Sequence, residues 1–526
     1  MRPPILARGE RANPALFWIG VVAVSSGVLL HLPMYVRSAT MNFHLAGMPL
    51  DREMLLGMAL IASGTAAVFC GLLPAALRRI SPGLMQAEIA DLAKAAPIEP
   101  DGKLNRQHWR LLTVLTLAVV IDSMKPASLG FVVPGTAQEY GLTREIVALF
   151  PFCALSGLTV GSYAWGIIAD RVGRRAAILL SGVMFVGTAI CGAMPAFQWN
   201  LLMCFFMGLA AGGMLPITYT LLAECIPSKQ RGWALVLVGA FGLIGGWFAA
   251  SGCATLLEPH FGWRILWFLN APTGVILILC NNYIPESPRF LLAVGRVAEA
   301  RELVKRFAVQ VDPRQWADTG AAHAQLGAKD LMRGRFQAMT ATLNLAAAAW
   351  GLVNFGLLLW LPAELRARGY SVAGSNELLL YSSLLALPTT LLVAVLYSRW
   401  STKWTLVILT VLTACSLVSM PLLDAALELF RGSSLVVFSA LMVGVNGIIA
   451  VLLPYSAESY PVLVRGRGTG LVAGSSKFGG LAANALTVAA MAPGMMAAAL
   501  ALAVPVAASA GMIARFGRET RSISLD

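Results

Sequence analysis

The sequence predicts an all-α membrane protein with fourteen membrane-spanning helices. Of its 526 residues, 58% are hydrophobic and only 12% are charged, whereas soluble domains carry roughly 25% charged residues. Apolar runs of about 20 residues, the length of a helix that crosses a hydrocarbon core, recur along the whole chain. Strands of a membrane β-barrel would instead alternate over about ten residues. These observations exclude a soluble enzyme, a secreted disulfide-linked scaffold and a disordered chain.

The apolar runs set the positions of the expected spans. The first run follows three arginines, as in a signal peptide, but about 22 apolar residues exceed the hydrophobic region of such a peptide. We therefore expect a membrane helix there. The fourteen expected spans are 15–36, 54–77, 111–134, 146–169, 176–196, 199–222, 233–256, 264–283, 338–361, 377–398, 404–423, 432–454, 468–490 and 494–514.

The basic residues predict the orientation in the bilayer. Of the 39 Lys and Arg residues, 30 fall in one set of alternate loops, seven in the other set and two inside spans. Because Lys and Arg accumulate in cytoplasmic loops, we expect a multi-pass protein of the cytoplasmic (inner) membrane with both termini in the cytoplasm. The net charge of +13 then reflects topology, and no nucleic-acid partner is expected. The eight cysteines form no C-x-x-C pair, so no zinc site or disulfide framework is expected.

Two polar stretches divide the chain into expected domains. The longer one contains AEARELVKRFA, whose charge spacing predicts a short amphipathic helix. The expected parts are two additional N-terminal transmembrane helices in 1–80, a cytoplasmic linker in 81–110, a six-helix bundle in 111–283, a cytoplasmic loop and helix in 284–337, a second six-helix bundle in 338–515 and a cytoplasmic tail in 516–526.

The two expected six-helix bundles contain an internal repeat. AECIPSKQRG, which begins at Ala223, and AESYPVLVRG, which begins at Ala457, share A-E-x-x-P-x-x-x-R-G without a gap, at an offset of 234 residues. The same offset places the pair Gly245-Gly246 on the pair 479–480, which is also Gly-Gly. Two six-helix repeats are the architecture of many secondary transporters, whose central site lies near the middle of the membrane.

Four segments resemble motifs of the major facilitator superfamily. They are GIIADRVGRR in 166–175, PESPR in 285–289, VVIDSMKPASLGFVVP in 119–134 and NFGLLLWLP in 354–362. The third and fourth segments are similar to the aromatic acid:proton symporters and related metabolite:proton symporters. The resemblance implies the major facilitator fold of two six-helix bundles and transport rather than enzyme chemistry. The chain departs from these relatives by Ser123 and Lys125 in the D-G-F/Y-D helix and by its two additional N-terminal helices.

Three charged residues lie deep in the expected spans, where a charge costs roughly 2.5–3.5 kcal/mol on insertion scales. Asp122 lies 12 residues beyond Arg110, or about 18 Å along a helix. Lys125 is three residues further on, and Lys477 lies ten residues beyond Arg467, or about 15 Å. We expect Asp122 to carry the coupling proton and both lysines to bind an anionic substrate. The alternative is a buried ion pair that only holds helices together.

Four uncharged residues in the spans are further candidates for substrate contact: Asn354, Asn446, Tyr219 and Trp350. An asparagine in a membrane helix often bonds only to a neighbouring helix. Tryptophan and tyrosine near span ends are often interface anchors. Both alternatives remain open for these residues.

The resemblance also implies gates at the cytoplasmic ends of the spans. In the families resembled, carboxylate–arginine contacts hold the two halves together in the outward-facing state and break when the transporter opens inward. The second repeat has Ser398 in place of Asp170, so its gate is expected to be weaker. The gating residues implied are Gly166, Asp170, Arg171, Gly173, Arg174, Arg175, Glu224, Arg231, Glu286, Arg289, Glu458 and Arg465.

The two additional helices contain soft metal ligands. His31, Met34, Met41 and His44 are weak candidates for a late transition metal, although methionine is also an ordinary apolar residue of helices. We expect no metal and no other cofactor. The pair is expected to pack beside the core or to bind a protein partner.

The leading hypothesis is a proton-coupled symporter that moves a small organic anion, a carboxylate metabolite, by alternating access. The substrate, protons and the lipid bilayer are then its partners. Three alternatives remain open: a proton-antiport exporter of a metabolite or drug, a transporter of a metal or metal complex, and a membrane sensor or assembly factor that transports nothing.

Overall fold

The computed structural model describes residues 13–73, 88–92, 103–309, 336–426, 433–460 and 462–520. Regular structure in these residues is helical throughout, and they contain no strand. The first half of the chain forms α1 (Pro14–Leu29), α2 (Leu32–Arg37), η1 (Ser38–Met41), α3 (Arg52–Leu72), α5 (Arg106–Tyr140), α6 (Arg144–Val147), α7 (Leu149–Val172), α8 (Arg174–Thr188), η2 (Ala189–Ala193), α9 (Phe197–Ala211), α10 (Met214–Cys225), α11 (Ser228–Phe261), α12 (Ile265–Phe268), α13 (Asn270–Leu279), η3 (Cys280–Tyr283), α14 (Pro288–Ala293) and α15 (Val297–Arg306).

The second half continues the same all-helical pattern. It forms α18 (Gln337–Gly356), η6 (Leu358–Trp360), α19 (Leu361–Ala367), α20 (Val372–Ala386), α21 (Thr389–Val395), the π-helical turn η7 (Leu396–Trp400), α22 (Thr402–Ala426), α23 (Ser433–Ser459), α24 (Val462–Val488) and α25 (Met495–Phe516).

Thirteen helical stretches in the described residues are long and apolar enough to cross a membrane. They coincide with thirteen of the fourteen expected spans; the span expected at 146–169, for example, is the stretch Arg144–Val172. The remaining expected span, 468–490, coincides with the 27-residue helix α24, which carries Arg467 and Lys477. The all-α membrane fold expected from hydropathy is confirmed.

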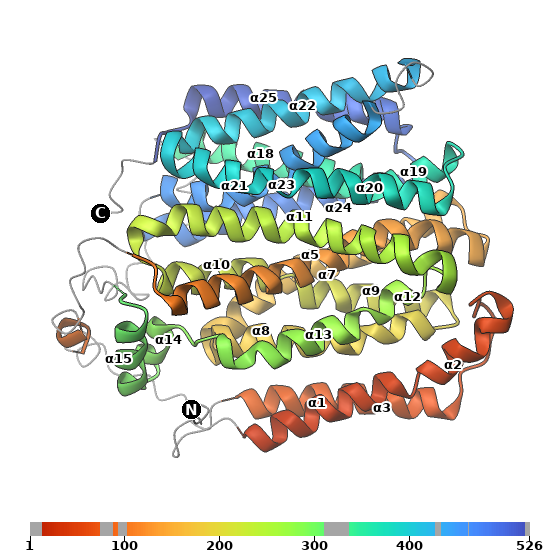
Figure 1. Cartoon of the computed structure of the whole chain (residues 1–526), viewed down its shortest axis with the longest axis horizontal. Coiled ribbons are helices and arrows are strands. Elements are labelled where there is room, and N and C mark those ends of the chain that lie inside the picture. Colours follow the sequence, from red (N-terminus) through yellow and green to blue (C-terminus); the bar gives the residue numbers. More distant parts are fainter. Residues whose placement is uncertain are drawn as a thin grey trace. The chain divides into compact units, whose positions relative to one another are not determined.

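Packing divides the chain into two compact units. Unit 1 contains Met1–Asp122, Ser156–Arg231 and His260–Asp318, and unit 2 contains Ser123–Leu155, Gly232–Pro259 and Thr319–Asp526. In unit 1, α8 packs against α13, α9 and α10. In unit 2, α18 packs against α24 and α25, and α22 packs against α23 and α25 (Figure 1). The domain boundaries expected from the sequence repeat stay a prediction.

The additional N-terminal helices form a closely packed antiparallel pair, α1 and α3 (Figure 1). Glycines allow this approach, since a Cβ atom at Gly20 would lie 2.6 Å from the Gly64 carbonyl oxygen and one at Gly27 2.6 Å from that of Gly57. The same small-residue packing joins membrane helices generally. Both helices also contact α8, so the pair packs beside the core of unit 1.

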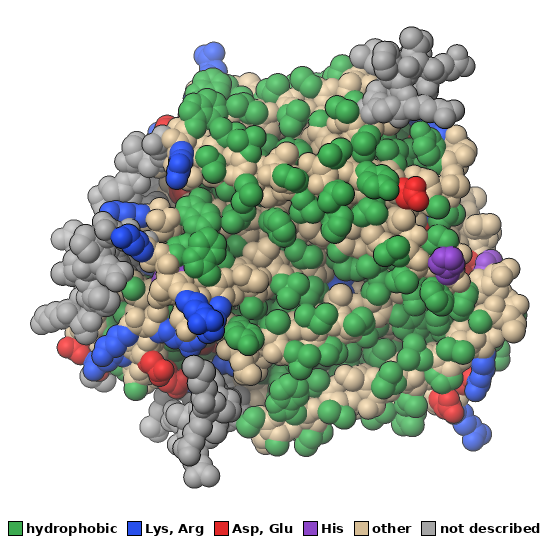
Figure 2. Space-filling view, viewed as in Figure 1, with side chains coloured by type: hydrophobic (Ala, Val, Ile, Leu, Met, Phe, Trp, Pro, Cys, Tyr) green, Lys and Arg blue, Asp and Glu red, His purple; other side chains and the backbone are tan. Residues whose placement is uncertain are grey.

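The exposed side chains fit a lipid environment. Figure 2 shows hydrophobic side chains covering the helices on the face in view, with Lys, Arg, Asp and Glu near the helix ends. Trp18, Ile19 and Leu55 of the N-terminal pair are all exposed. Exposed apolar side chains of this size on long helices are typical of a surface that faces lipid tails.

The amphipathic helix expected at AEARELVKRFA is α15, and it anchors the linker that precedes α5. Arg301 of α15 forms an ion pair of 2.6 Å with Asp91, while Ile89 and Leu92 of the linker are buried. The His108 Nε2 atom lies 2.9 Å from the carbonyl oxygen of Phe307. These contacts fix the start of α5 within unit 1.

Candidate functional site

The first half of the candidate site is built where α5 crosses α11 in unit 2. Ser123 donates a hydrogen bond of 2.8 Å to the carbonyl oxygen of Gly242. A Cβ atom at Gly246 would meet the Ser123 side chain and lie 2.7 Å from the backbone nitrogen of Met124. The backbones therefore touch at this point. Ser123, which replaces the glycine of the resembled motif, serves this contact, and Lys125 follows it with an exposure of 2%.

The repeat-related helices α18 and α24 cross in the same manner. A Cβ atom at Gly351 would lie 2.9 Å from the Gly480 backbone nitrogen, and one at Gly480 would lie 2.5 Å from the Phe355 ring. Gly246 and Gly480 are the residues that the 234-residue offset superimposes. The glycine pairs of the sequence repeat thus mark the same kind of close helix crossing in both halves. One crossing lies beside Lys125, and the other involves the helix that carries Lys477.

Two of the predicted substrate contacts have structural hydrogen bonds in unit 2. Trp350 donates its indole N–H to the carbonyl oxygen of Val445 at 2.7 Å. Asn446 donates its amide to the carbonyl oxygen of Met442 at 2.9 Å. The Trp350 bond joins α18 to α23, so this residue has a structural role whatever it does for a substrate.

Two other predicted contacts keep hydrogen-bonding capacity. Among the described residues, the amide oxygen of Asn354 and the phenolic oxygen of Tyr219 are buried without a hydrogen-bond partner. Asn354 belongs to unit 2 and Tyr219 to unit 1. A buried polar atom of this kind is costly, which suits a position that a substrate group or water satisfies. Lys477 is half-buried on α24 and Asp122 is buried on α5.

The residues predicted to gate the first repeat gather around a carboxylate at the start of α8. The Glu286 Oε1 atom accepts the backbone N–H groups of Arg174 at 2.7 Å and Arg175 at 3.4 Å, together with that of Ser287 at 2.9 Å. A carboxylate at a helix N-terminus satisfies free N–H groups and the helix dipole. Burial raises the pKa of the Glu286 carboxyl, while the N–H groups of Ser287 and Arg174 oppose this rise.

Gly173 is required by the same contact. Its φ of 111° lies in the region that favours glycine, and a Cβ atom there would collide with the Glu286 carboxylate. Gly166, by contrast, has open space around it. The two glycines of the resembled motif therefore differ: the structure requires Gly173 and leaves room for a side chain at Gly166.

Arg174 connects the other carboxylates of this gate in unit 1. Its Nη2 atom lies 3.2 Å from the Asp170 carboxylate and 4.0 Å from that of Glu224. Arg175 donates from Nε to Asn281 at 2.8 Å. The structure thus brings together most of the predicted first-repeat residues. Of three other predicted positions, Arg171 is exposed, whereas Arg231 and Arg289 are half-buried.

The second repeat builds the corresponding contact from a carboxylate and hydroxyl groups. Glu519, just after α25, accepts the backbone N–H of Thr402 at 3.0 Å and the Thr402 hydroxyl at 2.7 Å, and it also accepts the Ser401 hydroxyl. Glu458 accepts the hydroxyls of Tyr397 and Thr520, each at 2.7 Å. The side chain of Arg465 lies outside the described residues.

Sequence reasoning missed Glu519, although a signal was present. Glu286 follows the sixth core span and caps α8, the third core helix. In the same way, Glu519 follows the twelfth core span and caps α22, the ninth core helix. The two glutamates are 233 residues apart, close to the repeat offset, and each precedes a hydroxyl residue, Ser287 or Thr520.

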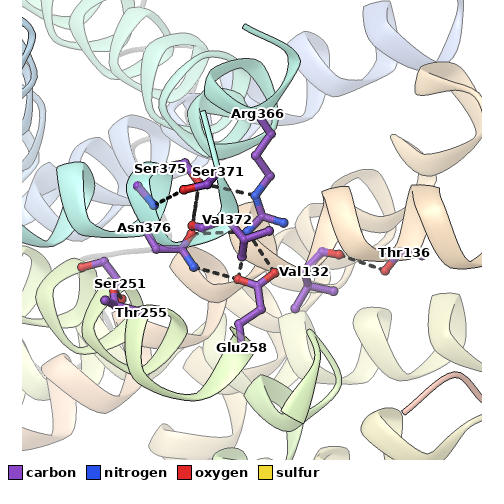
Figure 3. A network of polar contacts seen from close by, with 11 residues as sticks. Val132, Thr136, Ser251, Thr255, Glu258, Arg366, Ser371, Val372, Ser375 and Asn376 are labelled. Carbon is purple, nitrogen blue, oxygen red and sulfur yellow. Dashed lines mark hydrogen bonds and ion pairs between the residues drawn. The ribbon is translucent and has the colours of Figure 1, made fainter. Parts of the chain in front are cut away.

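A second polar cluster, which we call the Glu258 cluster, was also missed. It consists of Glu258 near the end of α11, Arg366 on α19, and Ser375 and Asn376 on α20 (Figure 3). Arg366 Nη2 donates to both carboxylate oxygens of Glu258, at 2.9 and 2.8 Å. Asn376 Nδ2 donates to the same carboxylate at 2.8 Å. The cluster lies wholly in unit 2, at the end of α11 opposite to Arg231.

Among the described residues, no group of three His, Cys, Asp or Glu side chains is placed to hold an ion; a site that uses Met34 and Met41 stays a prediction. The His31 Nδ1 atom instead lies 2.7 Å from the Gly27 carbonyl oxygen. Its ring also packs against Gly57, where a Cβ atom would lie 2.5 Å from the imidazole.

Repeated helix crossings, repeated helix caps and buried charges in apolar spans define a membrane transporter with two related halves. The sequence profile of the Major Facilitator Superfamily matches residues 115–484, and the chain belongs to this superfamily.

Known proteins agree with this assignment. The niacin transporter NiaP of Acinetobacter baylyi is 30% identical over 399 residues, which cover 75% of this chain and 89% of that one. The 4-hydroxybenzoate transporter PcaK of the same species is 28% identical over 288 residues, covering 52% and 61%. The proton:xylose symporter XylE from E. coli has the same fold, with a TM-score of 0.63 at 16% identity over 80% of this chain and 97% of that one.

These matches confirm the resemblance found in the sequence motifs. The chain is a multi-pass membrane transporter of small organic molecules in the branch of the aromatic acid and metabolite symporters, and it is not an enzyme. The profile begins four residues into the first core span, so the N-terminal pair lies outside the matched region.

Proposed function

We propose that the chain is a proton-coupled symporter of a small organic carboxylate, aromatic acids foremost, that works by alternating access. The observation that carries this proposal is the presence of two lysines inside apolar helices, Lys125 on α5 and Lys477 on α24. Lys125 is almost fully buried, with 2% exposure. An ammonium group in such a place needs an anionic neighbour.

Asp122 supplies one negative charge on the same helix as Lys125, three residues earlier, where the two side chains share a helix face. Lys125 and Lys477 bring two positive charges into the apolar spans, and these charges attract an anionic substrate. The carboxylate of the substrate supplies a further negative charge beside Lys125 and Lys477, and the buried amide oxygen of Asn354, in the same unit, can accept a hydrogen bond from a donor group of the substrate. Asp122 takes up and releases the coupling proton.

The relatives support this substrate class. Niacin and 4-hydroxybenzoate, named for NiaP and PcaK, are both aromatic rings that carry one carboxylic acid group. The charge pattern supports the direction of insertion, since the loop set with 30 of the 39 Lys and Arg residues is the set that faces the cytoplasm in an inner membrane. The gates around Glu286 and Glu458 then face the cytoplasm, and the Glu258 cluster faces outward.

The test is substrate-driven proton flux in proteoliposomes. Nicotinate, 4-hydroxybenzoate and the neutral amide nicotinamide are added outside, and the external pH and the uptake of labelled compound are recorded. We expect uptake of a carboxylate with alkalinisation outside, loss of the pH change in D122N, and a raised KM in K125A and K477A.

Two results would contradict the proposal. Acidification outside would identify antiport, and unchanged carboxylate transport in both K125A and K477A would refute the assignment of the lysines. A conservative variant, K125R, keeps the charge and controls for loss of folding, because it should retain binding of the anion better than K125A.

A further inference from the structure

We propose that Arg366, Ser375 and Asn376 form a carboxylate-binding entry site for the transported anion, and that Glu258 occupies this site as an internal competitor in the conformation described. The inference rests on the function proposed above. It adds a second substrate position, at the end of α11 opposite to the cytoplasmic gates, and assigns recognition to residues outside the predicted central site.

The donors of the proposed site contact one another directly, in addition to their contacts with Glu258. Arg366 donates from Nε to the Ser375 hydroxyl at 3.4 Å and from Nη2 to the Asn376 amide oxygen at 3.3 Å. Ser375 and Asn376 are adjacent in the first turns of α20 and are fully buried. Arg366 precedes them by one short connection, at the end of α19. These contacts orient the guanidinium group before any carboxylate arrives.

The occupant comes from the other sequence repeat. Glu258 is on α11, the fifth core helix, whereas α19 and α20 belong to the seventh and eighth core spans. Its side chain is 5% exposed, and its carboxylate accepts hydrogen bonds from Arg366 Nη2 and Asn376 Nδ2 at 2.8–2.9 Å. Arg366 is the charged group that faces this carboxylate, and Asn376 is its neutral donor. Movement of α11 away from α19 and α20 within unit 2 during alternating access would withdraw Glu258 and leave the donors of α19 and α20 together.

The chemistry of the donor set selects a carboxylate. A guanidinium group makes strong charge-assisted hydrogen bonds with a carboxylate, here from the single Nη2 atom to both oxygens of Glu258, and the nearby N-terminus of α20 favours negative charge. The structure already contains this complex with Glu258 as the ligand. A free substrate carboxylate presents the same two oxygens and makes the same bonds.

The experiment measures the KM for external nicotinate and 4-hydroxybenzoate in right-side-out vesicles that contain the full-length chain. The variants are E258Q, R366Q and N376A, and the matched control is E364Q, which removes an ion pair between Glu364 on α19 and Arg368 just after this helix. We expect E258Q to lower the external KM at least threefold, R366Q to raise it at least tenfold, N376A to raise it, and E364Q to leave it unchanged.

The opposite changes in external KM expected for E258Q and R366Q distinguish a substrate-binding site from an ion pair that only holds the helices together. A pair that only holds the repeats together gives the same direction of change in E258Q and R366Q, and that result overturns the inference. The double variant E258R/R366E restores an ion pair and tests folding; its external KM stays raised if Arg366 binds substrate and returns to the wild-type value if the pair is only structural. If the wild-type protein transports no carboxylate, the proposed function is overturned as well.

Discussion

The Glu286 carboxylate accepts the backbone N–H of Arg174 at 2.7 Å and thereby ties the segment after α13 to the start of α8. The two residues are 112 positions apart in the chain. Because the contact uses backbone N–H groups, it fixes the helix start itself and leaves the Arg174 side chain to pair with Asp170 and Glu224. The residues predicted to gate the first repeat therefore form a capped helix start that presents an arginine.

The backbone of Gly173 makes this cap possible, and G173A tests it. The methyl group of an alanine there collides with Glu286, and the alanine backbone must adopt a φ of 111°. We therefore expect a loss of about 1–3 kcal/mol in the free energy of unfolding. G166A is the matched control, because its Cβ atom meets open space. Thermal unfolding of the purified protein in detergent measures both. Equal melting temperatures for the two variants would show that the cap contributes little.

The pH dependence of stability tests the buried carboxylate. Burial raises the Glu286 pKa above its ordinary value of 4.5, so the folded chain holds the proton more tightly than the unfolded chain. The contribution of Glu286 to the free energy of unfolding is therefore full below the ordinary pKa and declines as pH rises through the raised one.

The measurement compares E286Q, which cannot ionise, with the wild type. We expect the Tm difference, E286Q minus wild type, to increase as pH rises from about 4 to 8, because the wild type loses stability over this range. E299Q, which removes the ion pair between Glu299 of α15 and Arg296 just before it, is the control for the loss of a carboxylate outside the Glu286 contact. A difference between E286Q and the wild type that stays constant over this range would argue that the pKa of Glu286 is unperturbed by burial.

The helix crossing beside Lys125 predicts a further effect on both stability and transport. G246A places a methyl group against Ser123 and the Met124 backbone, and overpacking of this kind costs typically about 1–3 kcal/mol. We also expect transport to fall, because α5 carries Asp122 and Lys125. G252A on the same helix is the control, since its Cβ atom would meet Leu380 at an ordinary 3.5 Å. Uptake assays and thermal unfolding that fail to distinguish the variants would exclude a tight crossing.

The sequence predicted the helices well because a bilayer imposes a simple requirement on each span: about 20 apolar residues. Spans such as 176–196 and 494–514 therefore appear nearly unchanged as Arg174–Ala193 and Met495–Phe516. The sequence also predicted Glu286, because its motif is conspicuous beside Arg289. Glu258 was missed because its partners, Arg366 and Asn376, lie more than 100 residues away and no local pattern marks the contact.

Glu519 gives the last prediction, because it repeats the role of Glu286 in the second half of the chain. It accepts the backbone N–H and hydroxyl of Thr402 at the start of α22. Loss of a helix cap costs about 0.5–2 kcal/mol. E519A should therefore lower the Tm, and E286A, measured beside it, should lower the Tm by a similar amount.

The control for E519A is R515A, which changes a charged side chain on the last turn of α25 and should leave stability within about 0.5 kcal/mol, as surface substitutions usually do. T402V, which keeps the backbone N–H but removes the hydroxyl, should fall between the wild type and E519A. If E519A and R515A unfold at the same temperature, the cap on α22 contributes nothing measurable, and the two repeats stabilise their gates by different means.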